Sequence, residues 1–229
     1  IARQFPDSAA KALRLERIAR VERKGPHQLI HLDSGATLHA HFRMNGDWLV
    51  SKSTDPPNRF SRAVIELTDG TRIELSDSRA LAVLSLHAKG ENPLPSLGIE
   101  ANDPALDAKY LKQALKGRRG PIKPAMMDQK VIAGLGNIYA AESLWRAKIS
   151  PRAVSSSLSM ARLERVASAI HAVLDDENRA PGRYTDKEGR DRFQVYDREG
   201  EPCSRCKTKI KRIPQAGRST YFCPHCQRS

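Results

Sequence analysis

Short runs of alternating apolar and polar residues dominate the chain from about residue 27 to residue 87. The runs lie at 29–32, 37–42, 47–50, 64–67 and 72–75. Asp69-Gly70 separates the last two, and this dipeptide supplies the positive φ that a tight primed turn requires. Several short strands joined by turn residues predict an antiparallel β-sandwich domain, which we place at residues 1–90.

The apolar positions change to helical spacing after residue 105. Glycine and proline are frequent at 91–105, which predicts a linker. Helices are expected at 107–116, 124–131 and 137–148, and a fourth is expected to begin after Ser159, a good N-cap residue. We interpret their apolar stripes as core. The charged stretch 175–192 is expected to be a loop, so the helical domain is placed at 106–195 and a last module at 196–229.

The last module contains the only four cysteines of the chain, Cys203, Cys206, Cys223 and Cys226. Two CxxC pairs let four thiolates converge on one Zn²⁺, whereas a CxxC pair is poorly shaped for a disulfide across its own turn. The spacing therefore predicts one structural zinc ion in a ribbon-like β-hairpin. Such an ion can serve only to hold a small fold together.

Charge suggests what the chain binds. It has 39 Lys+Arg against 26 Asp+Glu, a formal net charge of +13. This excess favours a polyanionic partner, although a basic protein can also be no more than a soluble cation. No apolar run approaches the ~20 residues of a membrane span, and no signal peptide is recognisable. We expect no membrane association and a cytoplasmic location, beside the nucleoid in a bacterium, where thiols stay reduced for zinc.

Two glycines, Gly134 and Gly136, directly precede the third predicted helix. Glycines at this place let the backbone approach an anion, and the helix N-terminus offers free N–H groups. The alternative is a tight interhelical turn with no ligand. Asn137 and Tyr139 are correspondingly either hydrogen-bonding groups for a phosphate backbone, or an N-cap and a core aromatic.

Two ordered motifs resemble one known family. Asp128-Gln129-Lys130-x4-Gly134-Leu135-Gly136-Asn137-Ile138-Tyr139 is similar to the helix-two-turn-helix signature of the formamidopyrimidine-DNA glycosylase / endonuclease VIII family. Residues 217–227, preceded by 196–203, resemble its C-terminal zinc finger. The resemblance extends from about Arg20 to the end. It implies an α+β protein that acts on duplex DNA with damaged bases or abasic sites, everts the oxidised nucleotide, cleaves its glycosidic bond and nicks the strand. The sequence does not give the oligomeric state, but we expect a monomer, which would suffice to bind one duplex.

The resemblance also implies roles for single residues. Met44 is expected to be an apolar wedge in the DNA, and Arg79 to face the orphaned base, with Leu81 where the family has an aromatic filler. The residues expected to grip phosphates are Lys130, Asn137, Tyr139 and Arg218. Without the resemblance, Met44 reads as a core filler and Arg79 as a surface cation.

The sequence departs from the family pattern at the catalytic groups. The family's nucleophile is the amine of an N-terminal proline followed by glutamate, and no Pro-Glu pair begins this sequence. We expect that pair, with the strand and helix that open the β domain, to belong to a segment upstream of Ile1. Pro26 stands where the family has a second catalytic lysine, and Lys24 is the nearest substitute. The segment between 172 and 193 looks short where the family has a lesion-capping loop.

Two other functions stay open at this point. The first is a family member that binds damaged or distorted DNA without cleaving it, or with a different nucleophile. The second is an RNA-binding zinc-ribbon protein, against which the scarcity of aromatics for base stacking argues.

Overall fold

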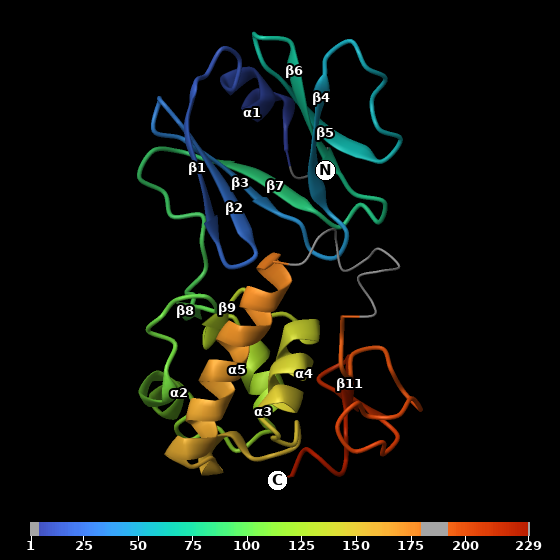
Figure 1. The fold of residues 1–229 in the computed structure, drawn as a ribbon. Coiled ribbons are helices and arrows are strands. Elements are labelled where there is room, and N and C mark those ends of the chain that lie inside the picture. The colour runs from blue at the N-terminus through green and yellow to red at the C-terminus, as the bar shows by residue number, and fades with distance from the viewer. Residues whose placement is uncertain (1–4, 180–191, 229) are drawn as a thin grey trace. The chain divides into compact units, whose positions relative to one another are not determined.

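The computed structural model describes residues 5–179 and 192–228, with only the backbone of 177–179. The chain forms two compact units, Ile1–Pro95 and Ser96–Ser229. Strands build the first unit, while helices and a small hairpin build the second (Figure 1). The predicted α+β class is therefore confirmed. The predicted short loop between 172 and 193 lies largely outside the described residues.

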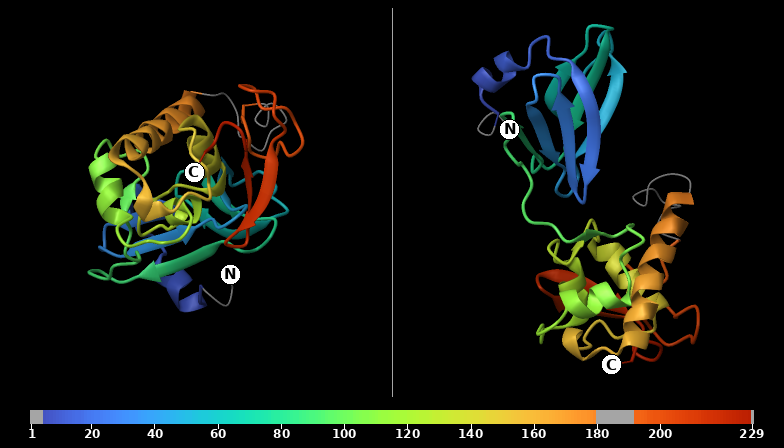
Figure 2. Two further views of the ribbon diagram at one scale, coloured as in Figure 1. Left: turned by 90° about the horizontal axis from the view of Figure 1, so that it is seen from below. Right: turned by 90° about the vertical axis from the view of Figure 1, so that its left-hand side faces the viewer.

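Two antiparallel sheets follow a short helix, α1 (Asp7–Ala12), in the first unit. The strand order is β1-β2-β3-β7 in one sheet and β4-β6-β5 in the other. Figure 2 shows the two sheets as separate layers in its right-hand view. The strands are β1 (Ile18–Lys24), β2 (His27–Leu32), β3 (Thr37–His41), β4 (Asp47–Lys52), β5 (Ser61–Glu66), β6 (Thr71–Ser76) and β7 (Val83–His87). Apolar alternation did not predict β1, because this edge strand is largely exposed and has no buried face of its own.

The core of this unit lies between the two sheets. Leu38 of β3 and Leu84 of β7 pack in one cluster with Leu75 of β6 and Ile65 of β5. Val64, the neighbour of Ile65, is 48% exposed. The alternation seen in the sequence thus separates a core face from a solvent face, as a β-sandwich requires.

Five of the seven histidines lie on the face of the first sheet that is turned away from this core. They are His27, His31, His39, His41 and His87. His27 Nδ1 lies 2.8 Å from His39 Nε2, and His39 Nδ1 lies 3.3 Å from Ser85 Oγ. Burial, followed by the positive charges of neighbouring histidines and Arg43, lowers the pKa of His39 to about 4. The ring of His39 is therefore neutral at pH 7.

Acidification is expected to destabilise the protein through this histidine row. His39 has a lower pKa folded than its ordinary 6.5, so unfolding takes up a proton and stability falls as the pH drops from about 6.5 to about 4. For His39 alone, the loss between pH 7 and pH 5 is on the order of 1–2 kcal/mol. Urea unfolding at both pH values should show a smaller loss for His39→Gln than for the wild type. A loss in His39→Gln as large as in a His31→Gln control would contradict this assignment.

The second unit contains four α-helices in its described part, α2 (Ala108–Ala114), α3 (Ile122–Met127), α4 (Asn137–Arg146) and α5 (Met160–Arg179), and a 3-10 turn, η1 (Ser155–Ser157). Their buried apolar residues form a single core, to which α4 contributes Leu144 and α5 contributes Val166 and Ile170. The predicted helices therefore exist, and their apolar stripes are core. The predicted loop at 175–192 was wrong for residues 175–179, which continue α5, because charged residues are compatible with a helix.

Helix α3 ends at Met127 rather than at residue 131, because side chains take over the hydrogen bonds that would continue it. Asp128 has an extended backbone, and its carboxylate accepts the N–H of Lys130 at 3.0 Å. Gln129 Oε1 accepts the N–H of Gly134 at 2.8 Å. Such local bonds compete with helical ones. The chain leaves the helix here and forms strand β9 (Ile132–Ala133).

Strand β8 (Ile99–Glu100) pairs in parallel with β9 and lies within the stretch 91–105 that was expected to be a linker. Gly98, just before β8, donates its N–H to the carbonyl of Gln129 at 2.8 Å. A Cβ at Gly98 would lie 2.4 Å from the carbonyl oxygen of Val131. Glycine is required here because two backbones approach each other closely.

Gly98→Ala is expected to destabilise the second unit by about 1–3 kcal/mol, because rigid backbone must move to admit the methyl group. Gly120→Ala is the matched control, since a Cβ there meets nothing within 4 Å. Chemical denaturation of both variants measures the difference. Equal stability of the two variants would show that the backbones of β8 and β9 can separate to admit the methyl group without a loss of unfolding free energy.

The last element is a hairpin of β10 (Lys211–Gln215) and β11 (Arg218–Phe222), which Figure 1 shows beside α4. Tyr221 is buried with Trp145 of α4 and with Val195 in a small cluster of its own. None of the described helices is long and apolar enough to span a membrane.

Candidate nucleic-acid interface and metal centre

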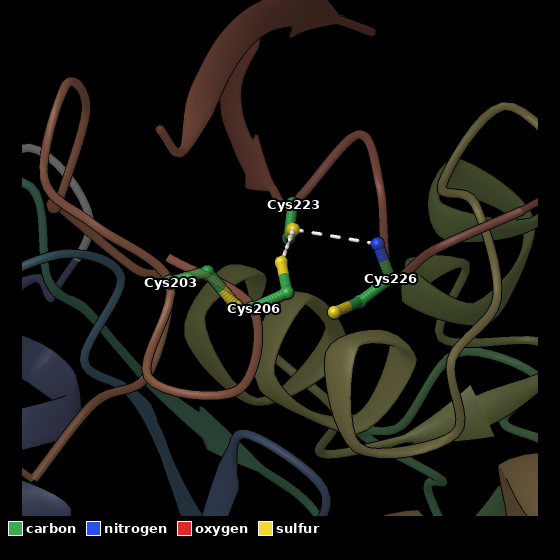
Figure 3. A group of neighbouring side chains, drawn as sticks. All are labelled: Cys203, Cys206, Cys223 and Cys226. Atoms are coloured by element: carbon green, nitrogen blue, oxygen red, sulfur yellow. Dashed lines mark hydrogen bonds between the residues drawn. The ribbon is translucent and has the colours of Figure 1, made fainter. Parts of the chain in front are cut away.

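The four cysteines come together at one point of the second unit. Their Sγ atoms all lie within 4.8 Å of one another, and Figure 3 shows the four side chains converging. Four thiolates on a tetrahedron with Zn–S bonds of about 2.3 Å would have sulfurs ~3.8 Å apart. The residues therefore fit a zinc ion, and the module holds one structural zinc.

The loop around the first CxxC pair donates hydrogen bonds to the thiol of Cys206. The backbone carbonyl of Cys203 accepts a hydrogen bond from the N–H of Lys207 at 2.8 Å, and Lys207 has a φ of 61°. Hydrogen bonds from the hydroxyl and N–H of Thr208 lower the pKa of the Cys206 thiol to about 6. Burial raises the pKa of the Cys226 thiol to about 12, so the four thiols differ before zinc binds them in the deprotonated form.

In the first unit, strand pairing brings the predicted wedge and the predicted arginine to the same end of the sandwich. Residues 42–46 connect β3 to β4, and residues 77–82 connect β6 back to β7. β3 pairs with β7, and β4 pairs with β6, so both connections cross between the sheets side by side. Met44 is 59% exposed and Leu81 is 45% exposed, and Arg79 is exposed as well. Met44 is therefore not a core residue.

Asp77 holds the second of these connections in shape. Its side chain is fully buried, and its carboxylate accepts the N–H groups of Arg79, Leu81 and Ala82 at 2.6 to 2.9 Å. Burial opposes ionisation of Asp77, but these three bonds prevail and leave its pKa lowered. Charged Asp77 thus fixes the backbone from which Arg79 and Leu81 project.

In the second unit, the signature segment forms a rigid turn before α4. Gln129 is clamped across this turn, because its amide binds Gly134 on one side and the carbonyl of Met127 on the other. Gly134 has a φ of 82°, which favours glycine, and Gly136 occupies the N-cap of α4 without a capping side chain. The first N–H groups of α4 therefore have no side-chain cap.

Asn137 joins this helix N-terminus to the zinc hairpin. Its Nδ2 donates to the carbonyl of Ser219 in β11 at 3.1 Å, and its Oδ1 accepts a hydrogen bond from Lys123. Lys123 also donates to Thr220 Oγ1 at 2.9 Å. The interpretation of Asn137 as an N-cap was wrong, since Gly136 holds that position and the Asn137 side chain points to β11 instead.

Lys123 is a buried cation that sequence reasoning missed. It is 1% exposed, and burial, followed by the charge of Arg218, lowers its pKa to about 8. Lys123 and Arg218 both line a cavity of about 190 Å³. The available signal was a lysine within an otherwise apolar stretch, residues 122–127. Two cations beside one cavity make a site for an anion.

The remaining predicted residues lie in different surroundings. Lys130 is exposed next to the Asp128 turn, while Tyr139 is half-buried against the helical core. Lys24 Nζ lies 3.5 Å from Glu22 Oε1, with about half of its side chain exposed. Pro26 follows Gly25, whose φ is 53°, in the two-residue turn between β1 and β2. A positive φ at the first of the two turn residues is what a primed hairpin turn requires, and Pro26 occupies the second position.

Comparison with known proteins identifies the family of this chain. Three family models match: the formamidopyrimidine-DNA glycosylase N-terminal domain at residues 1–84, the formamidopyrimidine-DNA glycosylase H2TH domain at 97–183, and the zinc finger found in FPG and IleRS at 200–228. The formamidopyrimidine-DNA glycosylase of Novosphingobium aromaticivorans is 36% identical over 241 residues, which cover 99% of this chain and 87% of the relative.

Solved structures agree with this result. The MutM (Fpg) protein of Thermus thermophilus matches with a TM-score of 0.82 at 32% identity, over 93% of this chain and 83% of that protein. The Fpg of Lactococcus lactis in complex with DNA containing FAPY-dG matches with a TM-score of 0.87 at 28% identity, over 97% and 86%. On this evidence the chain belongs to the formamidopyrimidine-DNA glycosylase family.

Proposed function

We propose that this protein is a base-excision-repair DNA glycosylase with AP-lyase activity, which binds damaged duplex DNA and everts the oxidised nucleotide. Its relatives are named as formamidopyrimidine-DNA glycosylases, and similar solved structures hold DNA with FAPY-dG or with an abasic site. An amine attacks C1′ and the base leaves with the bonding electrons, after which the base takes up a proton. The Schiff base that forms acidifies the C2′–H, and loss of that proton expels the 3′-phosphate.

The junction of Lys123, Asn137 and β11 carries this proposal. It joins the N-terminus of α4 to the hairpin that presents Arg218, so both elements form one phosphate-binding surface. Lys130 and Tyr139 flank the same turn and add a cation and a hydroxyl. Contacts of this kind fix the register of a protein on DNA without reading its sequence.

Borohydride trapping tests the chemistry. The protein, incubated with a duplex that contains an abasic site, is expected to give a covalent adduct when borohydride reduces the Schiff base. If Lys24→Ala forms the adduct as fast as the wild type, the N-terminal proline implied by the resemblance is supported as the nucleophile. Loss of the adduct in Lys24→Ala, with duplex binding intact, would show that the chemistry needs Lys24, either as the amine or as the second catalytic lysine. No adduct at all, with duplex binding intact, would overturn the lyase assignment.

A binding protein without cleavage is the second candidate, and Pro26 is the observation that favours it. Pro26 fills a turn position that the family gives to a lysine, and proline has no side-chain amine to supply. Lys24, the nearest substitute, is engaged with Glu22 on the edge strand β1. The trapping experiment separates this candidate from the first.

Met44 and Arg79 are proposed to fill the space that the everted nucleotide leaves, with Leu81 beside them. Unstacking costs a few kcal/mol, which an inserted apolar side chain and a guanidinium offset. Met44→Ala and Arg79→Ala are expected to weaken binding to abasic-site duplex by roughly tenfold, about 1.4 kcal/mol, and binding to intact duplex by much less.

Val50→Ala and Arg20→Ala are the matched controls, because both residues are exposed in the same unit and lie outside these two connections. Titration of each variant with both duplexes gives the ratio of affinities. Equal losses of affinity for the abasic-site duplex and the intact duplex would show that Met44 and Arg79 contact DNA without recognising the lesion.

A monomer in the cytoplasm, beside the nucleoid, is the working state we propose. One duplex offers one lesion at a time, and a single chain carries each proposed contact. Four unpaired cysteines, clustered for a metal, suit a reducing compartment.

A further inference from the structure

Trp145 connects helix α4 to the zinc module. Its side chain is 6% exposed and packs in one cluster with Ala141, Val195 and Cys203. Its indole Nε1 is buried and, by strict hydrogen-bond geometry, has no acceptor among the described residues. The fully buried Cys203 lies in the same cluster, and its sulfur is the acceptor that we consider for this N–H. A buried N–H without an oxygen or nitrogen acceptor calls for an explanation.

Cys203 is placed to receive it. Its side chain is fully buried, and it belongs to the same CxxC pair that encloses Arg205. A neutral thiol is a weak acceptor, whereas a thiolate that ligates a metal carries negative charge and accepts hydrogen bonds well. Zinc ligation would therefore satisfy the indole N–H that the neutral thiol leaves poorly bonded.

Arg205 fixes the orientation of the indole ring. Its Cζ lies 3.6 Å from the centroid of the Trp145 ring, and its Nη1 donates to the Trp145 carbonyl at 2.7 Å. The guanidinium thus covers one face of the ring and is tied to the same residue. Arg205 lies within the first CxxC pair, so the loop that supplies two cysteines also holds the tryptophan in place.

We propose that Trp145 is an outer-sphere residue of the zinc site, whose indole N–H hydrogen-bonds to the metal-bound sulfur of Cys203 while Arg205 holds the ring. The bond places a donor beside the negatively charged ligating sulfur and so favours retention of the metal. Helix α4 thereby belongs to the metal centre, although it contributes no ligand. This inference concerns metal retention and does not rest on the proposed reaction.

Zinc transfer to a chromophoric chelator tests the proposal directly. Trp145→Phe keeps the ring and loses the N–H, and it is expected to release zinc at least about tenfold faster than the wild type. Trp48→Phe, in β4 of the first unit, removes the only other tryptophan and should release zinc at the wild-type rate. Arg205→Met should give an intermediate rate, because the N–H remains but the ring is no longer held.

Hydrogen exchange of the indole protons provides a second test that needs no variant. In the zinc-loaded wild type the Trp145 indole proton is expected to exchange slowly, and chelation should accelerate its exchange at least about tenfold while that of Trp48 stays unchanged. The proposal is overturned if Trp145→Phe holds zinc as long as the wild type. It is equally overturned if the Trp145 proton exchanges at the same rate with and without zinc.

Discussion

Replacing Cys223 with serine is expected to abolish zinc binding and to reduce affinity for abasic-site duplex by about a hundredfold or more. The apolar core of the module is small, so the metal supplies most of its folding energy, and structural zinc sites contribute about 10–16 kcal/mol. Without the metal, β11 loses its anchor at Cys223. Arg218 and the carbonyl of Ser219 then no longer stand beside Lys123 and Asn137.

Metal analysis and duplex titration measure the two effects in the same preparation. His225→Ala is the matched control, because His225 lies exposed inside the second CxxC pair and is not one of the clustered ligands. The control should keep about one zinc per chain and bind DNA as the wild type does. Full duplex affinity in a metal-free Cys223→Ser protein would show that the hairpin takes no part in binding.

The cysteines could be assigned from the sequence because their chemistry is local. Two residues between cysteines suffice to form a ligand turn, and the spacing of the two pairs is visible without a fold. The helices of the second unit were predictable for a similar reason, since each carries its own apolar stripe. Both predictions are confirmed, so short-range sequence patterns alone were sufficient to predict the metal ligands and these helices.

Lys123 could not be assigned in this way, because its role depends on residues far away in the sequence. It meets Asn137 and Thr220 only after α3, α4 and β11 have packed. The same holds for Asp77, whose three acceptor bonds depend on the turn that it shapes. Helix α3 ends early because the side chains of Asp128 and Gln129 bind nearby backbone N–H groups. A search for apolar periodicity does not detect such bonds.

Helix α4 links these features. Its first residue, Asn137, holds the hairpin near Ser219, and Trp145 near its other end packs against Cys203. Between them, Glu142 accepts the N–H groups of Gln194, Val195 and Tyr196, each at 2.9 Å. The zinc module thus contacts α4 at its first residue, at its middle and near its last turn. Loss of the metal is therefore expected to displace the hairpin from the N-terminus of α4, where the proposed phosphate site lies.

Replacing Lys123 with methionine is expected to weaken binding of abasic-site duplex about tenfold at pH 7 and to flatten its pH dependence near pH 8. The pKa of Lys123 is about 8 because burial and the charge of Arg218 disfavour its charged form. A phosphate bound at Arg218 would favour that form and raise the pKa. Binding then takes up a proton, so wild-type affinity should fall as the pH rises through about 8.

Stability should respond differently, which separates the two roles of Lys123. Since its pKa is lower folded than the ordinary 10.5, the unfolded chain binds more protons, and wild-type stability should rise between about pH 8 and 10.5. Methionine removes this slope. It also leaves Asn137 Oδ1 and Thr220 Oγ1 without their donor, at about 1–3 kcal/mol each, while it ends the burial of a charge. The two effects oppose each other, so the net change in unfolding free energy is smaller than the larger of them.

Lys130→Met is the matched control for Lys123→Met, because Lys130 is exposed and lies in the turn that follows α3, the helix of Lys123. Loss of this surface cation should weaken binding at every pH by a similar factor and leave the slope near pH 8 as in the wild type. Duplex titrations from pH 7 to pH 9 at fixed ionic strength distinguish the two variants. If Lys123→Met keeps the wild-type slope, Lys123 only braces Asn137 and β11, and the proton taken up on binding comes from another group.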